Sequence, residues 1–280
     1  MENRDKLYKY TEIAIKMGEI IDEYICNDTY GYVRMHQALK LKAEFSAEKS
    51  EYFPHVPCER TVYRIMEHEG LVHQPKRKPN SLTKADKEAQ KSDNLLKQDF
   101  YAEKPCEKAV TDITEIPCKD GKLYVAGVFD CFDNMALSMV FSNNMKADLV
   151  CTALETAVAA HRELIWNKAI VHSDRGSQYT SEMYRDFVEK TGVIQSMNSA
   201  AGRCHDNAKC ESMWGRFKEE LLYGRYNTER MTRNEVKTLV WRYFMGYWNN
   251  SRVCSANGGL PPAIKRTRFL KSAANLHHAA

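Results

Sequence analysis

Apolar side chains recur at three- and four-residue steps in three segments near the N-terminus, at 4–25, 33–41 and 59–69. This spacing predicts three amphipathic helices. Arg60 and Arg64 stand four residues apart in the third segment, so they share one exposed side of its helix. Three short helices with a basic outer face are typical of a helix-turn-helix module, which would bind DNA through these arginines. A plain helical packing domain with solvated arginines fits the same spacing equally well.

The pattern changes to α/β character near residue 108, where apolar runs begin to alternate with segments of helical spacing. The predicted strands are 109–116, 123–132, 137–141, 169–172 and 193–197, and the predicted helices are 148–164, 181–190 and 207–222. The Asp120-Gly121 pair marks a hairpin between the first two strands. Three consecutive strands followed by strands that alternate with helices favour a mixed five-stranded sheet with helices on its faces. A capping-box pattern from Thr232 to Glu235 begins one more helix.

A basic segment at 72–98 separates these two patterns. It holds seven Lys or Arg and three Asp or Glu, and its net charge of +4 equals that of the whole chain. Its prolines and few large apolar side chains predict an extended linker, with Lys76, Arg77 and Lys78 placed to contact DNA phosphates. The sequence thus divides into a helix-turn-helix-like region, a basic linker, a catalytic core and a C-terminal helical extension, at 1–71, 72–104, 105–225 and 226–280.

Composition excludes several classes of protein. Apolar residues make up 43% of the chain, which is enough to bury a core and excludes a disordered or fibrous chain. No run of about eighteen apolar residues predicts a membrane span, and the N-terminus carries no apolar leader. The nine cysteines include no Cys-x-x-Cys pair, which argues against a zinc ribbon and for free thiols in a reducing compartment. We therefore expect a cytoplasmic protein.

Three carboxylates occupy chemically suggestive positions. Asp112 lies within an apolar strand, Asp174 directly follows a short buried strand, and Glu211 is near the start of a helix. Each position alone has an ordinary explanation: a solvated strand face, a turn cap, or a favourable charge at a helix N-terminus. Together, two acids on neighbouring strands and one on a facing helix could hold two divalent metal ions for phosphodiester chemistry.

The helix after Glu211 adds a cation. Lys218 follows two turns along the same face, with Gly215 between them. A glycine inside a helix costs about 1 kcal/mol relative to alanine, and close approach of a DNA backbone would explain its presence. Lys218 is then placed to contact a phosphate. Trp214 and Phe217 face elsewhere and are expected to pack in the core.

These residues occur in motifs that are similar to those of a known family. The motifs read TDIT at 111–114 and HSDRGSQY at 172–179. The third is Asp206-Asn207-Ala208, followed by Glu211 and Lys218. This set resembles the integrase core of insertion-sequence transposases, in particular the second-reading-frame (OrfB) products with a retroviral-integrase-like catalytic domain. Upstream, YGYVR at 30–34 and RTVYRIM at 60–66 resemble the helix-turn-helix segment of the same family.

The resemblance implies an RNase H-like fold and a DDE triad. Asp112, Asp174 and Glu211 match the triad, which would hold two Mg²⁺ ions, with Mn²⁺ as a substitute. Lys218 matches the basic residue after the glutamate, and Arg175 lies within the second motif as a further candidate for DNA contact. The implied chemistry is cleavage of a DNA strand by water, after which the freed 3′-hydroxyl attacks another phosphodiester.

The resemblance also implies partners. The implied substrates are the double-stranded element ends and a DNA target, bound by a homo-oligomer associated with the nucleoid, away from any membrane. A partner from an upstream reading frame (OrfA type) is typical of the family.

Two alternatives remain open from the sequence. Between Asp174 and Glu211 lie 36 residues, one more than is common in the family, with the extra residue in a loop. A catalytically decayed or repurposed DNA-binding protein is therefore one alternative. The other is an RNase H-like nuclease that cuts DNA without joining it.

Overall fold

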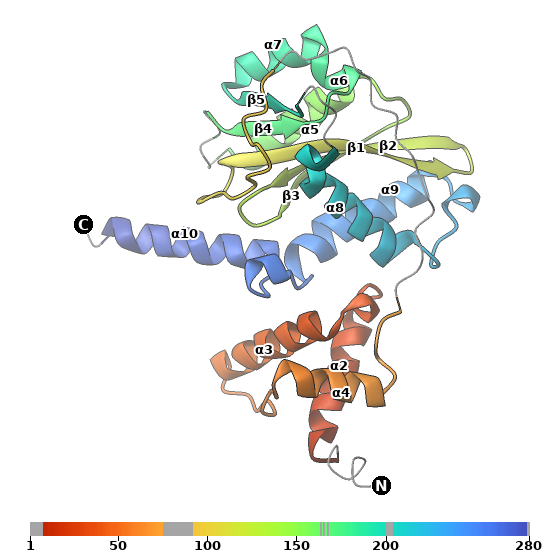
Figure 1. Ribbon diagram of the computed structural model, residues 1–280, viewed down its shortest axis with the longest axis vertical. Coiled ribbons are helices and arrows are strands. Elements are labelled where there is room, and N and C mark those ends of the chain that lie inside the picture. Colours follow the sequence, from red (N-terminus) through yellow and green to blue (C-terminus); the bar gives the residue numbers. More distant parts are fainter. Residues whose placement is uncertain are drawn as a thin grey trace. The chain divides into compact units, whose positions relative to one another are not determined.

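The computed structural model describes residues 8–74, 92–162, 164, 166, 168–199 and 204–278 (Figure 1). The chain forms two compact units. The first comprises Met1–Arg77 with Asn250–Lys265, and the second comprises Lys78–Asn249 with Arg266–Ala280. Residues 250–265 therefore belong with the N-terminal helices, although the sequence places them in a C-terminal extension.

Three helices build the first unit: α2 (Thr11–Glu23), α3 (Tyr32–Glu48) and α4 (Glu59–His68). Short 3₁₀ turns lie at Tyr8–Tyr10, Asn27–Thr29 and Ser255–Asn257. The three predicted helices are confirmed, but α3 runs a further two turns, because the residues after Leu41 include neither glycine nor proline.

The core of the first unit comes from the apolar face of each helix. Met17, Leu39 and Val62 are fully buried in one cluster, which also includes Val253 from the C-terminal segment. The backbone N–H of Val253 donates to the Tyr30 hydroxyl over 3.0 Å. This segment is therefore part of the first unit's hydrophobic core.

The second unit is built on a mixed sheet in the order β3-β2-β1-β4-β5. Its strands are β1 (Lys108–Cys118), β2 (Gly121–Asp130), β3 (Ala136–Ser142), β4 (Ile170–Ser173) and β5 (Ile194–Met197). The first three strands pair antiparallel, whereas β4 and β5 run parallel to β1. The predicted five-stranded mixed sheet is confirmed.

The helices of the second unit follow the strands closely. They are α5 (Ala147–Ala160), α6 (Ser177–Thr180), α7 (Glu182–Thr191), α8 (Ala208–Phe217) and α9 (Arg233–Trp241). The helix predicted at 207–222 becomes a π segment at Lys218–Leu222, and α9 continues as a second π segment at Arg242–Trp248. A long helix that the sequence did not predict, α10 (Pro262–His278), ends the described chain. Short 3₁₀ turns at Cys204–Asn207 and Thr228–Arg230 complete the elements.

Strand register shows that helices cover both faces of the sheet. Ser138 donates to the carbonyl of Ala153 in α5, so its face of the sheet is covered by α5. Its partner across the ladder is Val128. Because successive strand residues point to opposite faces, the neighbouring Phe129 lies on the other face, where its ring packs 5.4 Å from that of Trp214 in α8. The catalytic candidate on β1, Asp112, therefore lies in a sheet enclosed between helices.

β1 extends beyond residue 116, where the predicted strand ends. β1 continues through Pro117 to Cys118, and a two-residue loop then leads to Gly121. Among the described residues, only Lys108–Val110 of β1 pair with β4. The rest of β1 pairs with β2 on one side and with no strand on the other. At such an edge the missing N–H of Pro117 leaves no ladder partner unsatisfied.

A close approach between α8 and the sheet depends on Gly127. This residue pairs with Asp112 on β1, and an added Cβ would lie 2.9 Å from the Phe129 ring and 3.0 Å from the Trp214 ring. We therefore expect Gly127→Ala to lower the free energy of unfolding by about 1–3 kcal/mol through overpacking, measured by urea denaturation. Gly246→Ala is the matched control, because nothing lies within 4 Å of its added Cβ. Equal stability of Gly127→Ala and the wild type would contradict this account.

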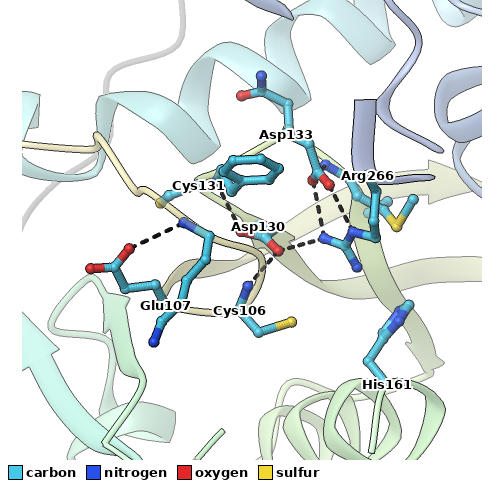
Figure 2. Close-up of polar contacts among 12 residues, drawn as sticks. Cys106, Glu107, Asp130, Cys131, Asp133, His161 and Arg266 are labelled. Atoms are coloured by element: carbon cyan, nitrogen blue, oxygen red, sulfur yellow. Dashed lines mark hydrogen bonds and ion pairs between the residues drawn. The ribbon is translucent and has the colours of Figure 1, made fainter. Parts of the chain in front are cut away.

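A buried ion-pair cluster lies at the end of β2 (Figure 2). Asp130 and Asp133 are completely buried, and Arg266 of α10 contacts both. The Arg266 Nε donates to Asp133 Oδ2 over 2.7 Å, and its Nη2 donates to Asp133 Oδ1 over 3.1 Å and also to Asp130 Oδ2. The backbone N–H of Cys106 also donates to Asp130 Oδ2, over 2.8 Å. The Arg266 bonds attach the part of α10 that belongs to the second unit to the end of β2 and the loop after it.

Candidate active site

Two of the predicted catalytic carboxylates lie side by side because of strand register. β1 and β4 are parallel neighbours in which Val110 pairs with His172. Asp112 and Asp174 each come two residues later, so they reach the same level on adjacent strands. The carboxyl ends of parallel strands are common ligand sites.

Electrostatics connect Asp112 to the other three predicted residues. Asp112 is half-buried, and its Oδ1 accepts the backbone N–H of Ile113 over 2.8 Å. Its pKa is raised to about 8, first by burial, then by the charge of Asp174 and less by that of Glu211, while the Ile113 N–H and Lys218 oppose the rise. Without a cation, Asp112 and Asp174 therefore resist being ionised together at neutral pH.

A glycine shapes the surroundings of Asp174. The backbone N–H of Gly176 donates to Asp174 Oδ1 over 2.9 Å. A Cβ on Gly176 would lie 3.1 Å from that oxygen and 2.8 Å from Gln178 Oε1, so a side chain would disturb this contact. Burial raises the pKa of Asp174, and the Gly176 N–H opposes the rise. The glycine thus allows a backbone donor to hold the carboxylate.

Helix α8 and the π segment that continues it supply the remaining two predicted residues. Glu211 is exposed in its first turn, and Lys218 is half-buried at its end. Burial lowers the pKa of Lys218, while the charges of Asp112 and Glu115 oppose the shift. As predicted, Trp214 faces away and is buried.

The four groups share one electrostatic environment without forming a closed metal site. Within the described part of the chain, no three His, Cys, Asp or Glu side chains lie close enough together to hold a metal ion. The donor chemistry nevertheless fits, since carboxylate oxygens are the ligands of hard cations such as Mg²⁺. The repulsion between Asp112 and Asp174 is the kind that a bound cation would relieve. Glu211, exposed on α8, is the group that would have to approach.

Buried groups beneath the carboxylates provide structure rather than ligands. The hydroxyls of Tyr179 and Thr111 lie 3.2 Å apart, and both residues are buried. Cys210 is fully buried beside Glu211, and burial followed by the charge of Asp112 raises the pKa of its thiol well above the ordinary value. This thiol therefore stays protonated and is unsuited to bind a metal ion.

His172 and Asp206 lie within the quoted motifs, but neither was predicted to be a site residue. Both are buried, and burial lowers the pKa of His172, which favours the neutral imidazole. Their only signal in the sequence is a polar residue at a strand end or before a helix.

The predicted DNA-contacting residues have different settings. Arg60 and Arg64 are exposed on α4, as their spacing predicted. Arg175 is half-buried, and its Nε donates to the Asn198 carbonyl over 2.6 Å, so part of its guanidinium is engaged within the chain. The remaining three candidates lie outside the described residues: Lys76, Arg77 and Lys78.

Two findings bear on the cysteines and on membranes. The eight cysteines whose side chains are described are all free thiols. Within the described residues, no helix combines the length and apolar character needed to cross a membrane.

Comparisons with known proteins found a matching family and several similar proteins. Residues 102–204 match the family described as Integrase core domain. A probable transposase for the insertion sequence element IS1353 from Shigella flexneri is 34% identical over 255 residues, covering 91% of this chain and 46% of that protein. The transposase InsF for insertion sequence IS3A from Escherichia coli K12 is 34% identical over 203 residues, covering 72% of this chain and 68% of that protein. Among solved structures, a chain of the simian T-cell lymphotropic virus intasome in complex with PP2A regulatory subunit B56 gamma has a TM-score of 0.44 at 15% identity, covering 78% of this chain and 70% of that chain.

The mixed sheet and the integrase-core match define an integrase-type catalytic core with an RNase H-like fold. The chain belongs to the insertion-sequence transposases that carry this core. It spans slightly less than half the length of the Shigella relative.

Proposed function

We propose that this chain catalyses metal-dependent DNA strand cleavage and 3′-hydroxyl strand transfer for the movement of an insertion sequence. One observation carries the proposal: the parallel pairing of β1 with β4 brings Asp112 and Asp174 to the same level, and burial with the charges of Asp174 and Glu211 raises the pKa of Asp112 there. A polar constellation with perturbed acidity between strand ends is typical of a catalytic site rather than of a structural one.

Each residue of the candidate site has a proposed role. Asp112, Asp174 and Glu211 would hold two Mg²⁺ ions, or Mn²⁺ in their place. When bound, such ions activate the attacking oxygen and stabilise the leaving oxygen of a phosphodiester. Lys218 would contact a DNA phosphate next to the carboxylates and orient the strand. Arg175 would contact DNA through the part of its guanidinium that does not bind the Asn198 carbonyl.

The proposed partners follow from this chemistry. The substrates are the double-stranded element ends and a target duplex, and joining two ends requires at least two copies of the chain on DNA. Arg60 and Arg64 on α4 are proposed to contact DNA outside the catalytic unit. An OrfA-type partner and a cytoplasmic, nucleoid-associated location, in keeping with the free thiols, complete the proposal.

A strand-transfer assay with labelled element ends tests the proposed function. In Mg²⁺ we expect a shortened strand followed by a joined product, and EDTA should abolish both. Free ends without joined product would favour a nuclease, whereas binding without nicking would favour a decayed DNA-binding protein. Either result would refute the proposal.

The basic linker supports a separate prediction about salt dependence. Neutralising Lys76, Arg77 and Lys78 should flatten the plot of log affinity against log salt concentration. The slope should change by up to about 2.7, because each phosphate contact contributes about 0.9. Fluorescence anisotropy with a labelled element end at several salt concentrations measures the slope.

The control for this prediction uses three exposed lysines on scattered elements of the catalytic unit: Lys119, Lys146 and Lys190. Neutralising them makes the same change in net charge. An equal change of slope in both variants would show that net charge matters rather than the linker. An unchanged slope in the linker variant would make the segment a solvated spacer.

A further inference from the structure

The buried His172 connects the strand of Asp174 to the neighbouring strand and to the loop beyond it. Its ring nitrogens lie 2.8 Å from Ser196 Oγ (Nδ1) and 2.9 Å from Asn198 Oδ1 (Nε2). The amide oxygen of Asn198 can only accept, so Nε2 donates and Nδ1 accepts the hydroxyl proton of Ser196. Ser196 Oγ in turn accepts the backbone N–H of Leu95 over 2.9 Å. The two buried groups, His172 and Ser196, therefore each have hydrogen-bond partners of the right kind.

Three residues around Asp174 form hydrogen bonds with Asn198. Besides the His172 contact, the Asn198 backbone N–H donates to the carbonyl of Ser173 over 3.2 Å. The Asn198 carbonyl accepts the Nε of Arg175 over 2.6 Å. The backbone at Asn198 is thus fixed to the residues immediately before and after Asp174.

Asp206 continues this connection to the helix of Glu211. The Ser199 backbone N–H donates to Asp206 Oδ2 over 2.8 Å, and Gln98 Nε2 donates to Asp206 Oδ1 over 3.0 Å. Asp206 is 2% exposed and lies in the 3₁₀ turn that leads into α8, five residues ahead of Glu211. Its carboxylate therefore connects the backbone at Ser199 to the start of the Glu211 helix.

We propose that His172 and Asp206 are positioning residues that set the separation between Asp174 and Glu211. The chain of contacts runs from the residues around Asp174 through Asn198 and Ser199 to Asp206, and every step is a hydrogen bond or a peptide bond. It joins both ends of the connection from β5 to α8, so it fixes α8 against β4. This inference rests on the proposed function, in which Asp174 and Glu211 hold metal ions together.

The arrangement also explains how an exposed Glu211 could bind the same metal ions as the two half-buried aspartates. An α8 fixed at its start leaves Glu211 only its own side-chain torsions with which to reach the metal ions. Residues outside the ligand set that orient metal ligands typically change metal affinity 10–100-fold when they are removed. Asp206 would act in this way through the backbone.

The test measures metal binding and helix order in the whole chain. Asp206→Ala should raise the Mn²⁺ concentration at which half of the sites are filled about 10–100-fold. Electron paramagnetic resonance of free Mn²⁺, in the absence of DNA, measures this midpoint. Cleavage should recover in part at saturating Mn²⁺, so that the metal midpoint shifts more than the maximal rate. Asp206→Asn keeps one oxygen that can accept the Ser199 N–H. Its metal midpoint should therefore lie between those of the wild type and Asp206→Ala.

Hydrogen–deuterium exchange without metal provides a readout that does not depend on activity. Asp206→Ala should speed exchange of the first turn of α8. The matched control is Asn94→Ala, which removes the 3.0 Å bond from Asn94 Nδ2 to Ser199 Oγ and the 2.8 Å bond from the Lys97 N–H to Asn94 Oδ1, but leaves the connection to Asp206 in place. It should leave the metal midpoint unchanged.

The outcomes separate the inference from the proposed function. A wild-type midpoint in a folded Asp206→Ala or Asp206→Asn variant would overturn the inference, as would an equal midpoint shift in Asn94→Ala. Unchanged exchange in Asp206→Ala would also overturn it. A wild-type chain that neither binds Mn²⁺ nor cleaves element ends would instead refute the proposed function.

Discussion

Asp174→Asn should abolish strand cleavage and leave the protein at least as stable as the wild type. The amide keeps an oxygen that can accept the Gly176 N–H, so the local structure is preserved. It removes a charge that raises the pKa of Asp112, and so relieves a repulsion in the metal-free protein. Because residues that merely orient ligands cost 10–100-fold, loss of a direct ligand should lower the cleavage rate by at least about 100-fold.

Three measurements check this prediction together. A gel assay of labelled element ends gives the cleavage rate, and thermal unfolding without metal gives the stability. The third is the rise in melting temperature on adding Mg²⁺, which the wild type should show and the variant should largely lose, since a ligand that binds only the folded state stabilises it. Asp112→Asn and Glu211→Gln should behave in the same way.

The control is Asp148→Asn, an exposed acid at the start of α5 that makes the same change in charge away from the site. It should retain wild-type cleavage. Retained cleavage and joining after Asp112→Asn, Asp174→Asn or Glu211→Gln would remove that residue from the triad. A lower melting temperature in metal-free Asp174→Asn would contradict the repulsion argument.

The sheet could be predicted because its signals are local. Apolar alternation and the Asp120-Gly121 turn predict the hairpin, and the structure confirms it at Cys118–Gly121. The capping box from Thr232 to Glu235 is also present, with both of its hydrogen bonds formed. Helix α10 was missed because, beyond Arg266, most of its side chains are exposed and it lacks a continuous apolar stripe.

The candidate site was predicted in part. The motifs identify Asp112 and Asp174, but the level at which they meet depends on the pairing of Val110 with His172, which only the folded sheet defines. The contact between Ser199 and Asp206 spans a loop, and polar residues before a helix are common. Nothing in the sequence distinguishes such a residue from an ordinary cap.

The buried cluster of Arg266 with Asp130 and Asp133 should be the most sensitive structural site outside the catalytic centre. Arg266→Met keeps much of the apolar stem but leaves two fully buried carboxylates without their cation. Breaking such a pair costs about 3–5 kcal/mol. For a unit of this size the melting temperature should fall by about 6–20 °C. Lys271→Met is the control, because it removes an exposed cation from the same helix.

The pH dependence of this loss separates charge from packing. In the wild type, burial and the charge of Asp133 raise the pKa of Asp130 to about 6, and Arg266 opposes the rise. Without Arg266 the folded pKa should rise further above the unfolded value, so the folded variant binds a proton that the unfolded chain releases. Its stability is then highest in acid and is lost as the pH rises through the folded pKa. The deficit against the wild type should therefore be smaller at pH 5 than at pH 8 in urea denaturation. A deficit that does not change with pH would mean that Arg266 stabilises the protein by packing its stem instead.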